Sequence, residues 1–279
     1  MTTLYVSDLD GTLLNTQGVV SDNSSRILSR LTEEGALVTV ATARTPATVE
    51  PLLSRVSTVL PAIVMTGAAL WDRQSLSYIE PRFIPVEVCA SILDTCLRHR
   101  VNPFVYTLGS GSFMTVYHNG PMQQCDRDFV AQRVNLPLKR FVLDASGVSD
   151  APQQGTILFF AMGPVKSIFA LADELRATVD CSVSSYIDIF GKDTGILEVF
   201  CTGVSKAEAV SRLACKAGAD RVVVFGDNLN DLPMMKVADI AVAVGNALDP
   251  VKDAADVVIG GNDDDSVARF IDRDFHRGQ

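Results

Sequence analysis

The sequence of 279 residues predicts an α/β protein in which helices cover both faces of a parallel sheet and an α+β module interrupts the chain. Three observations predict this class. Short apolar, β-branched runs alternate with amphipathic segments near both ends of the chain, as in βαβ units. The runs are apolar on both sides, which is typical of strands in a buried parallel sheet. The alternation stops in the middle of the sequence and later returns.

The first part of the chain predicts three strands and two helices. Each strand is an apolar run, and the first one ends in an acidic residue, Asp8. Apolar residues at helical spacing indicate the first helix, and Pro46 suits the first turn of the second. The predicted elements are strands at 4–8, 36–42 and 62–65 and helices at 21–34 and 46–56.

After Pro81 the order of the elements changes, and residues 84–188 predict a separate α+β module. An amphipathic helix is followed by a hairpin around Gly109, and a similar helix and strand come later. The predicted elements are helices at 87–100, 126–134 and 166–178 and strands at 103–108, 113–118, 141–143, 156–162 and 181–189.

The α/β alternation returns in the last part of the chain. We therefore expect one domain from residues 1–83 and 189–279, interrupted by the module at 84–188. The predicted elements are strands at 195–200, 221–225, 240–244 and 257–259 and helices at 205–217, 231–237 and 265–271.

The composition excludes several classes of protein. Hydrophobic residues make up 47% and charged residues 20%, which excludes a disordered chain. A net charge of -9 and 7% aromatic residues argue against nucleic acid as a partner. No apolar run reaches the roughly 18 residues of a membrane span, and the N-terminus lacks the features of a signal peptide. We therefore expect a cytoplasmic protein without a membrane partner, as a monomer or weak homodimer.

Cysteine and histidine offer no recognisable site. Six cysteines occur without a C-x-x-C pair, which favours reduced, buried thiols over a disulfide framework or a zinc site. The three histidines have no hydrolase motif around them.

Acidic residues follow two predicted strands. Asp8 and Asp10 come after the first strand and are separated by one residue, so we expect their carboxylates to point to the same side; Gly11 then allows backbone N–H groups to approach an anion. Asp227 and Asp231 follow the strand at 221–225. Taken alone, Asp231 could simply cap the next helix.

The two acidic segments together predict a metal site. Strand ends meet at one edge of a parallel sheet, where ligands bind, and carboxylates brought so close require a cation or a shared proton. An all-oxygen set of ligands suits Mg²⁺. Thr42, at the end of another strand, could hold an anion, and Lys206 at a helix start is unfavourable with the helix dipole, which suggests a working cation.

These motifs, in this order and spacing, resemble those of the haloacid dehalogenase-like hydrolases, and within them the Cof-type, subclass IIB sugar-phosphatase-like proteins. The resemblance covers nearly the whole chain. It implies a Rossmann-like core and makes the insert an α/β cap that sets substrate specificity. The matching segments are Asp8-Leu-Asp-Gly-Thr12, Thr42, Gly-Val-Ser-Lys206, Gly-Asp227-Asn-Leu-Asn-Asp231, Ala243-Val-Gly-Asn-Ala247 and Ala255-Asp256.

The resemblance implies a Mg²⁺-dependent phosphomonoester hydrolase that acts on a small molecule, such as a sugar phosphate. Asp8 would attack phosphorus to form an aspartyl-phosphate, and Asp10 would act as general acid and then general base. The implied metal ligands are Asp8, the backbone carbonyl of Asp10, Asp227 and Asp231, which could instead position Lys206. The implied phosphate-binding residues are Thr42, Ala43, Lys206 and Asn230. The cap loops at 109–113 and 186–192 would contact the substrate.

The sequence departs from the family pattern at three positions. Ala43 stands where the family commonly has Gly, Thr66 where it has Asn, and Ala207 where Gly often follows the lysine. These departures keep open a phosphate-ester sensor without turnover, and a phosphomutase of the same fold is the nearest alternative. A dinucleotide-binding enzyme is excluded, because no G-x-G-x-x-G follows the first strand. A two-component receiver domain would not need the insert.

Overall fold

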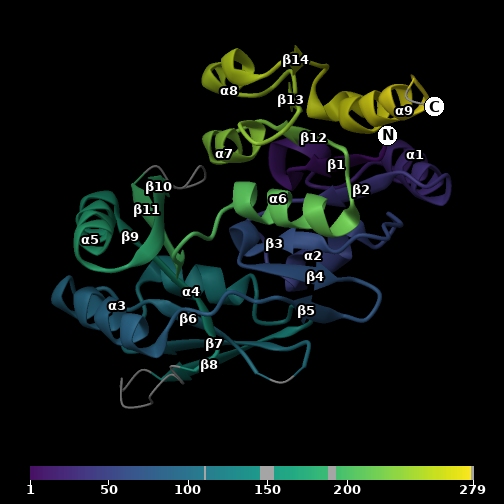
Figure 1. Cartoon of the computed structure of the whole chain (residues 1–279). Coiled ribbons are helices and arrows are strands. Elements are labelled where there is room, and N and C mark those ends of the chain that lie inside the picture. Colours follow the sequence, from purple (N-terminus) through teal and green to yellow (C-terminus); the bar gives the residue numbers. More distant parts are fainter. Residues whose placement is uncertain (110, 145–153, 188–192, 278–279) are drawn as a thin grey trace. The chain divides into compact units, whose positions relative to one another are not determined.

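A computed structural model describes residues 1–109, 111–144, 154–187 and 193–277 of the chain (Figure 1). The chain divides into two compact units. The first unit contains residues 1–79 and 205–279, and the second contains residues 80–204. In the described part of the chain, no helix combines the length and the apolar character that crossing a membrane requires.

The first unit is built on a five-stranded parallel sheet in the order β14-β13-β12-β1-β2. This sheet confirms the predicted fold class. Its strands are β1 (Thr3–Ser7), β2 (Leu37–Val40), β12 (Arg221–Gly226), β13 (Ile240–Ala243) and β14 (Val257–Val258). Its helices are α1 (Asp22–Glu33), α2 (Pro46–Leu53), α6 (Lys206–Ala217), α7 (Leu232–Met235), α8 (Asp249–Ala254) and α9 (Ser266–Arg277). Helix α8 was not predicted, and the helix predicted at 265–271 continues to Arg277 in α9.

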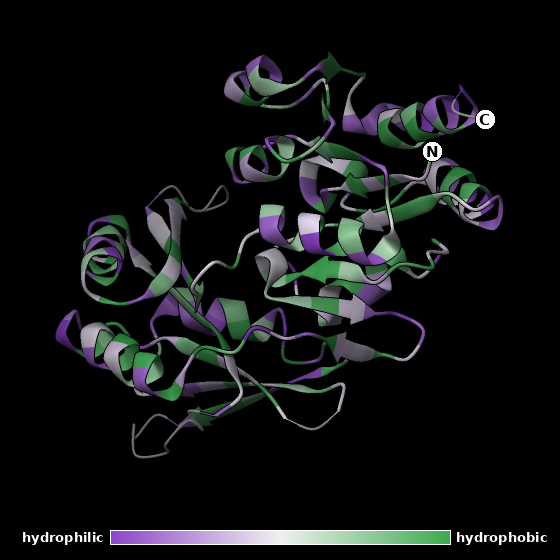
Figure 2. Ribbon diagram, in the orientation of Figure 1, coloured by the Kyte–Doolittle hydropathy of each residue, from purple (hydrophilic) through white to green (hydrophobic). Residues whose placement is uncertain are grey.

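Side chains of β1 alternate between two covered faces. Leu4, Tyr5 and Val6 are all buried, and most of the central strands are hydrophobic in Figure 2. The Tyr5 hydroxyl donates to Asp274 of α9 at 2.8 Å. Asp8 lies three positions later, so its side chain points to the opposite face, and there it accepts from Lys206 of α6. Helices therefore cover both faces of the sheet, as predicted.

The strand at 62–65 has a different place from the one expected. It forms β3 (Ala62–Val64), and one isolated parallel bridge, Ala41 to Ile63, links it to the chain just after β2. Its main partner is antiparallel, in a three-stranded sheet with β4 (Ala69–Asp72) and β5 (Ser77–Ile79). These two strands were not predicted, because the sequence analysis ended the strand at residue 65 and assigned no element between there and the helix at 87–100.

The second unit holds a six-stranded mixed sheet in the order β10-β11-β9-β6-β7-β8. Helices α3 (Val86–Arg98) and α5 (Val165–Thr178) pack on it around buried residues that include Ile92, Phe159 and Leu171. The strands are β6 (Phe104–Leu108), β7 (Met114–Asn119), β8 (Lys139–Asp144), β9 (Thr156–Pro164), β10 (Cys181–Ile187) and β11 (Thr194–Cys201), and the third helix is α4 (Gln124–Ala131).

Strand β11 lies in the second unit, whereas the sequence analysis assigned its residues to the first. It pairs antiparallel with β9 and β10, for example Val199 with Phe159 and Cys201 with Cys181. A short apolar run is compatible with a strand in a parallel sheet and with one in a mixed sheet. Only the pairing of β11 with its neighbours shows to which sheet it belongs. All six cysteines are free thiols, and Cys89 and Cys96 are buried.

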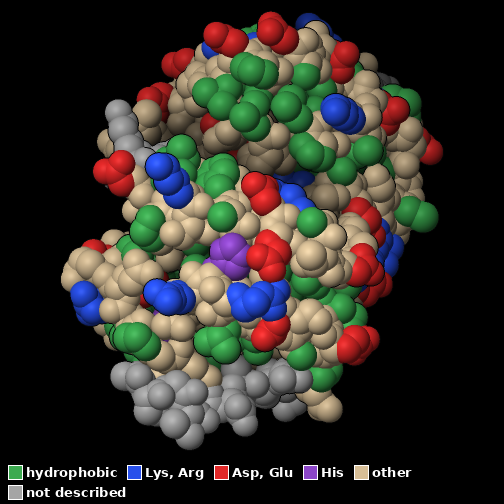
Figure 3. Space-filling view, turned by 90° about the vertical axis from the view of Figure 1, so that its left-hand side faces the viewer, with side chains coloured by type: hydrophobic (Ala, Val, Ile, Leu, Met, Phe, Trp, Pro, Cys, Tyr) green, Lys and Arg blue, Asp and Glu red, His purple; other side chains and the backbone are tan. Residues whose placement is uncertain are grey.

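On the face shown in Figure 3, acidic and basic side chains are interspersed among apolar ones.

Within the second unit, the two loops expected to contact substrate leave opposite ends of the sheet. The first loop, at 109–113, follows β6 in the chain at the Thr156 end of β9, and its residue 110 lies outside the described residues. In contrast, β10 ends at Ile187, which is paired with Gly195 near the Pro164 end of β9. Residues 188–192 of the second loop lie outside the described residues.

We expect the Tyr5→Phe substitution to destabilise the first unit by about 1.5 kcal/mol, because it removes a hydrogen bond to a charged group. Burial alone would raise the pKa of Asp274, but hydrogen bonds from Arg221 and Tyr5 hold it below its ordinary value. The stabilisation is therefore complete above the unfolded-state pKa near 3.9 and is lost as the pH falls through the lower folded-state pKa.

Urea unfolding of wild type and variant at pH 7 and in acid measures this difference. Tyr117→Phe is the control, because the Tyr117 hydroxyl has no hydrogen-bond partner in the described part of the chain. An equal loss in both variants would contradict the assigned role of Tyr5.

Candidate active site

The candidate site starts where β1 ends. Asp8 continues the extended backbone, donates its N–H to the Phe225 carbonyl at 2.9 Å and is buried. The chain then turns sharply through residues 9–13. Gly11 has φ +74°, and a Cβ there would lie 2.4 Å from Asp227 Oδ2. The turn therefore requires glycine, both for its backbone and for its close approach to Asp227.

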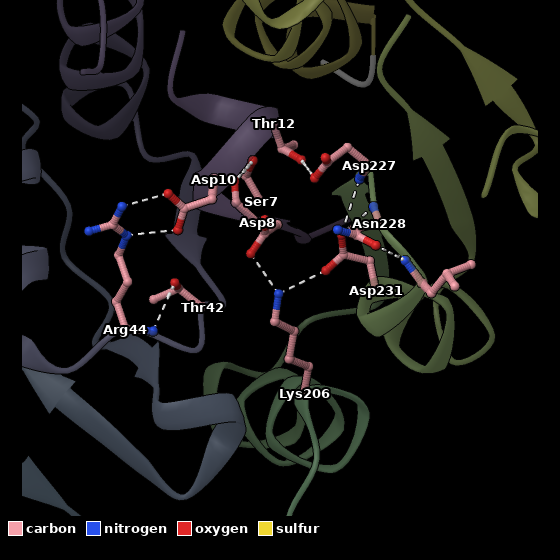
Figure 4. A network of polar contacts seen from close by, with 11 residues as sticks. Ser7, Asp8, Asp10, Thr12, Thr42, Arg44, Lys206, Asp227, Asn228 and Asp231 are labelled. Carbon is pink, nitrogen blue, oxygen red and sulfur yellow. Dashed lines mark hydrogen bonds and ion pairs between the residues drawn. The ribbon is translucent and has the colours of Figure 1, made fainter. Parts of the chain in front are cut away.

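Lys206 joins two of the carboxylates. Its Nζ donates to Asp8 Oδ1 at 2.6 Å and to Asp231 Oδ1 at 2.8 Å (Figure 4), and its side chain is 1% exposed. Burial alone would lower the pKa of Lys206, but the carboxylates of Asp8 and Asp231 raise it above its ordinary value. The lysine is therefore a cation in the folded protein.

Asp231 also fixes the backbone after β12. Its Oδ2 accepts the N–H groups of Asp227 and Asn228, both at 3.1 Å. Asp227 in turn accepts from the Thr12 hydroxyl at 2.9 Å. The strands β1 and β12 are neighbours in the sheet. The bond from Thr12 to Asp227 connects the segment after β1 with the segment after β12.

Three carboxylates come close enough to share one cation. Ligand atoms of Asp8, Asp227 and Asp231 all lie within 4.8 Å of one another. Burial raises the pKa of Asp8 against the opposing effect of Lys206. Burial also raises the pKa of Asp227 to about 6, which the bond from Thr12 opposes and the charge of Asp231 reinforces. This cluster of oxygen atoms has the donor chemistry that a hard divalent cation prefers.

Asp10 does not lie where the sequence analysis expected it. Its carboxylate is half exposed and is held by Arg44, with Nε to Oδ2 at 2.7 Å and Nη2 to Oδ1 at 2.6 Å. Figure 4 shows it pointing away from the three clustered carboxylates. The expectation of a common side assumed an extended chain, but Asp10 already belongs to the turn that begins at Leu9.

Thr42 and Asn230 differ in their surroundings. Thr42 is buried, and its hydroxyl oxygen accepts the Arg44 N–H at 3.1 Å. Ala43 follows it directly in the same turn. Asn230 is exposed, and its side chain has no hydrogen bond within the described residues. The phosphate contacts predicted for these residues stay predictions.

Two side chains that hold the site, Arg44 and Asn246, were not among the predicted site residues. Arg44 binds Asp10, and Asn246 donates to the Gly11 carbonyl at 2.7 Å. Arg44 directly follows the Thr42-Ala43 segment and Asn246 lies within the C-terminal family pattern, so proximity to the motifs was the available signal.

A strained turn supports the start of α6. Met65 and Thr66 have φ values of +50° and +56°. At Gly67, a Cβ would lie 2.4 Å from the Ser205 carbonyl oxygen. The close approach of this turn to Ser205 sets the position of the next residue, Lys206.

Nearly the whole chain matches one protein family. The model of the haloacid dehalogenase-like hydrolases matches residues 5–271, and the chain therefore belongs to that family. This membership confirms the resemblance seen in the sequence motifs.

Individual relatives have similar lengths. The pyridoxal phosphate phosphatase YbhA of Escherichia coli strain K12 is 28% identical over 97% of this chain and 98% of its own. The 5-amino-6-(5-phospho-D-ribitylamino)uracil phosphatase YcsE of Bacillus subtilis strain 168 is 26% identical, over 96% and 94%. A solved haloacid dehalogenase-like hydrolase from Bacteroides thetaiotaomicron has the same fold, with a TM-score of 0.78 and 24% identity over 99% and 100%.

We expect Thr66→Asn to stabilise the protein by about 1 kcal/mol, because asparagine tolerates the left-handed conformation better than a β-branched residue. The Thr66 hydroxyl makes no hydrogen bond in the described part of the chain, so none is lost. Urea unfolding measures the gain. Thr66→Val keeps the branched shape and should give no gain; a gain in Val but not in Asn would refute the argument from backbone strain.

Proposed function

We propose that this hydrolase removes phosphate from a small phosphomonoester, such as a sugar phosphate, with Mg²⁺ and through an aspartyl-phosphate on Asp8. One observation carries the proposal: a buried lysine holds Asp8 at the point where Asp227 and Asp231 converge. A carboxylate beside a cation and further acidic groups suits attack on a phosphate bound to metal.

The class of enzyme rests on the family and its relatives. The family consists of hydrolases. The relatives from Escherichia coli and Bacillus subtilis are named as phosphatases, and this chain matches them over nearly their whole length. They confirm the predicted class, a phosphomonoester hydrolase. The substrates in their names are two different small phosphorylated metabolites, which supports a substrate of that kind for this chain.

In the proposed reaction, an oxygen of Asp8 forms a bond to phosphorus as the bond to the substrate's ester oxygen breaks. Asp10 gives a proton to the leaving alcohol and then takes one from the water that hydrolyses the acyl-phosphate. Arg44 binds both carboxylate oxygens of Asp10. That ion pair has to open before Asp10 can carry a proton.

The charges of the site fit a divalent cation. Asp8, Asp227 and Asp231 carry three negative charges when ionised, and Lys206 neutralises one of them. Mg²⁺ would neutralise the remaining two and reduce the repulsion between Asp8 and a phosphate dianion. Asp8, Asp227 and the Asp10 carbonyl would hold the Mg²⁺ ion. Asp231 would either be a further metal ligand or position Lys206, and its hydrogen bond from Lys206 favours the second role.

Phosphate oxygens would be bound by the Lys206 ammonium, the Thr42 hydroxyl, the backbone of Ala43 and Asn230. A single such donor aimed at the developing charge is worth about 2.7–4 kcal/mol in other enzymes. We further propose that residues 84–188 act as the specificity cap, and that the protein works in the cytoplasm.

We expect Mg²⁺-dependent phosphate release from a panel of sugar phosphates, pyridoxal phosphate, nucleotides and para-nitrophenyl phosphate, and its complete loss in Asp8→Asn. EDTA should abolish release by the wild type. The control is Asp94→Asn, an exposed acidic residue of α3, which should retain activity. Turnover in Asp8→Asn would refute the scheme, transfer of phosphate to a sugar would indicate a mutase, and binding without release would indicate a sensor.

We expect Mg²⁺ to raise the melting temperature. At a concentration 100 times its Kd, the ion should increase the free energy of unfolding by about 2.7 kcal/mol. Asp227→Asn should lose this effect. Because the folded-state pKa of Asp227 is raised, its ionisation destabilises the free protein as the pH rises from about 4 to about 6.

The Asn variant should therefore be at least as stable as wild type at pH 7 without metal, while the Thr12 bond is kept. Thermal melts with Mg²⁺ and with EDTA at pH 5 and 7 test both statements. An unchanged Mg²⁺ response in this variant would exclude Asp227 as a ligand.

A further inference from the structure

The outer strand of the parallel sheet borders a groove that neither the site nor the proposed reaction uses. Two hollows of about 310 Å³ each lie between β14 and α9, and both are lined by Ile259, Gly260 and Arg273. Because they share these three lining residues, the two hollows adjoin, and we treat them together as one groove. In Figure 2, β14 is the hydrophobic arrow close to α9.

Apolar side chains of β14 line part of this groove, and the outer edge of the strand is open. Val257 is 36% exposed and Val258 is 51% exposed. Within the described chain, β14 pairs only with β13. The pairing continues on both sides of the two strand residues, since Asp256 and Ile259 donate to β13 carbonyls. One side of an extended backbone segment is therefore available to another strand.

A row of arginines forms one wall. Arg269, Arg273 and Arg277 are exposed and follow one another at intervals of four residues, so they lie on one face of α9. Arg269 lines the hollow at Ile259 and Gly260, and Arg277 lines the one at Val257 and Val258. The row therefore runs alongside the edge strand, in the opposite direction.

Two acidic residues of α9, Asp272 and Asp274, also line the hollows, and both are engaged with other side chains of the unit. Asp272 binds Arg30 at 2.7 Å, and Asp274 binds Tyr5 and Arg221. Asp265 approaches Arg269 only to 3.9 Å, while it also accepts bonds from Ser21, Asn23 and Ser24. Three arginines thus line the groove beside two aspartates that already have cationic partners, so the groove has an excess of positive charge in a protein whose net charge is -9.

We propose that this groove binds an extended acidic segment of another protein, which adds a strand to β14 and sets acidic side chains against Arg269, Arg273 and Arg277. Four residues of a helix span about 6 Å, and two residues of a strand span about 6.6 Å. Alternate side chains of an added strand thus match the spacing of the arginine row. Backbone pairing to a sheet edge is an established way to bind peptides.

A second copy of this chain is a poorer occupant. Two copies joined edge to edge by a twofold axis perpendicular to the sheet would place both α9 helices on the same side of the joined sheet. Two rows of arginines would then face each other, and like charges in an interface are costly. An acidic partner meets no such repulsion.

The test uses a fluorescent heptapeptide of alternating glutamate with valine or threonine, titrated against the full chain by anisotropy. We expect saturable binding that weakens with salt, and at least about tenfold weaker binding to Arg273→Glu. Arg26→Glu, an exposed arginine on α1, is the matched control and should bind like wild type. A lysine version of the peptide should not bind.

Strand addition is tested separately, on the peptide and not on the protein. N-methylation of every second residue removes the N–H groups of one peptide edge, and methylation of one of the two alternate sets should abolish binding. Equal binding of both methylated peptides, or of Arg273→Glu and wild type, would overturn the proposal, as would an absence of saturable binding. A dimer in light scattering that Arg273→Glu dissociates would overturn it in favour of self-association. Melting curves establish that the variants are folded. Because the measurement is binding of the peptide, the result does not depend on phosphatase activity.

Discussion

The ammonium group of Lys206 is the interaction on which the rest of the site depends. Burying a lone charge costs several kcal/mol, and the cost is offset only when the charge is paired and hydrogen-bonded. Lys206 finds its partners in Asp8 after β1 and Asp231 after β12. A Cβ at Gly67 would clash with Ser205 and one at Gly226 would clash with Asp231, so two glycines allow these segments to meet. One cation thereby fixes three parts of the chain that are distant in sequence.

Arg44 divides the acidic residues into two sets. By binding both oxygens of Asp10, it removes one carboxylate from the cluster around Lys206. The set that remains has two more negative charges than positive ones, which is why a divalent cation suits it. The same ion pair gives Asp10 a position of its own, separate from Asp8.

The sequence predicted the parts of the structure that local patterns determine. Runs such as the one at 221–225 predicted buried strands, and the acids behind them predicted a common edge, because parallel strands end together. Three features depended on pairing or on turns, and these were not predictable in the same way. β11 joined the sheet of the second unit, β3 gained antiparallel partners, and Asp10 turned away from Asp8. In each case the residues fit both arrangements equally well, and contacts with distant parts of the chain decided between them.

The three departures from the family pattern have separate physical consequences. Ala43 does not have a positive φ, so its Cβ replaces glycine without backbone strain. Ala207 lies in the first turn of α6, where alanine favours the helix over glycine by about 1 kcal/mol. Thr66 alone adopts a conformation that its side chain disfavours. That strain lies in the turn against Ser205, and it does not alter the bonds that Lys206 makes to Asp8 and Asp231. The departures therefore change local backbone energies while the arrangement of the charged groups stays intact, which favours turnover over mere binding.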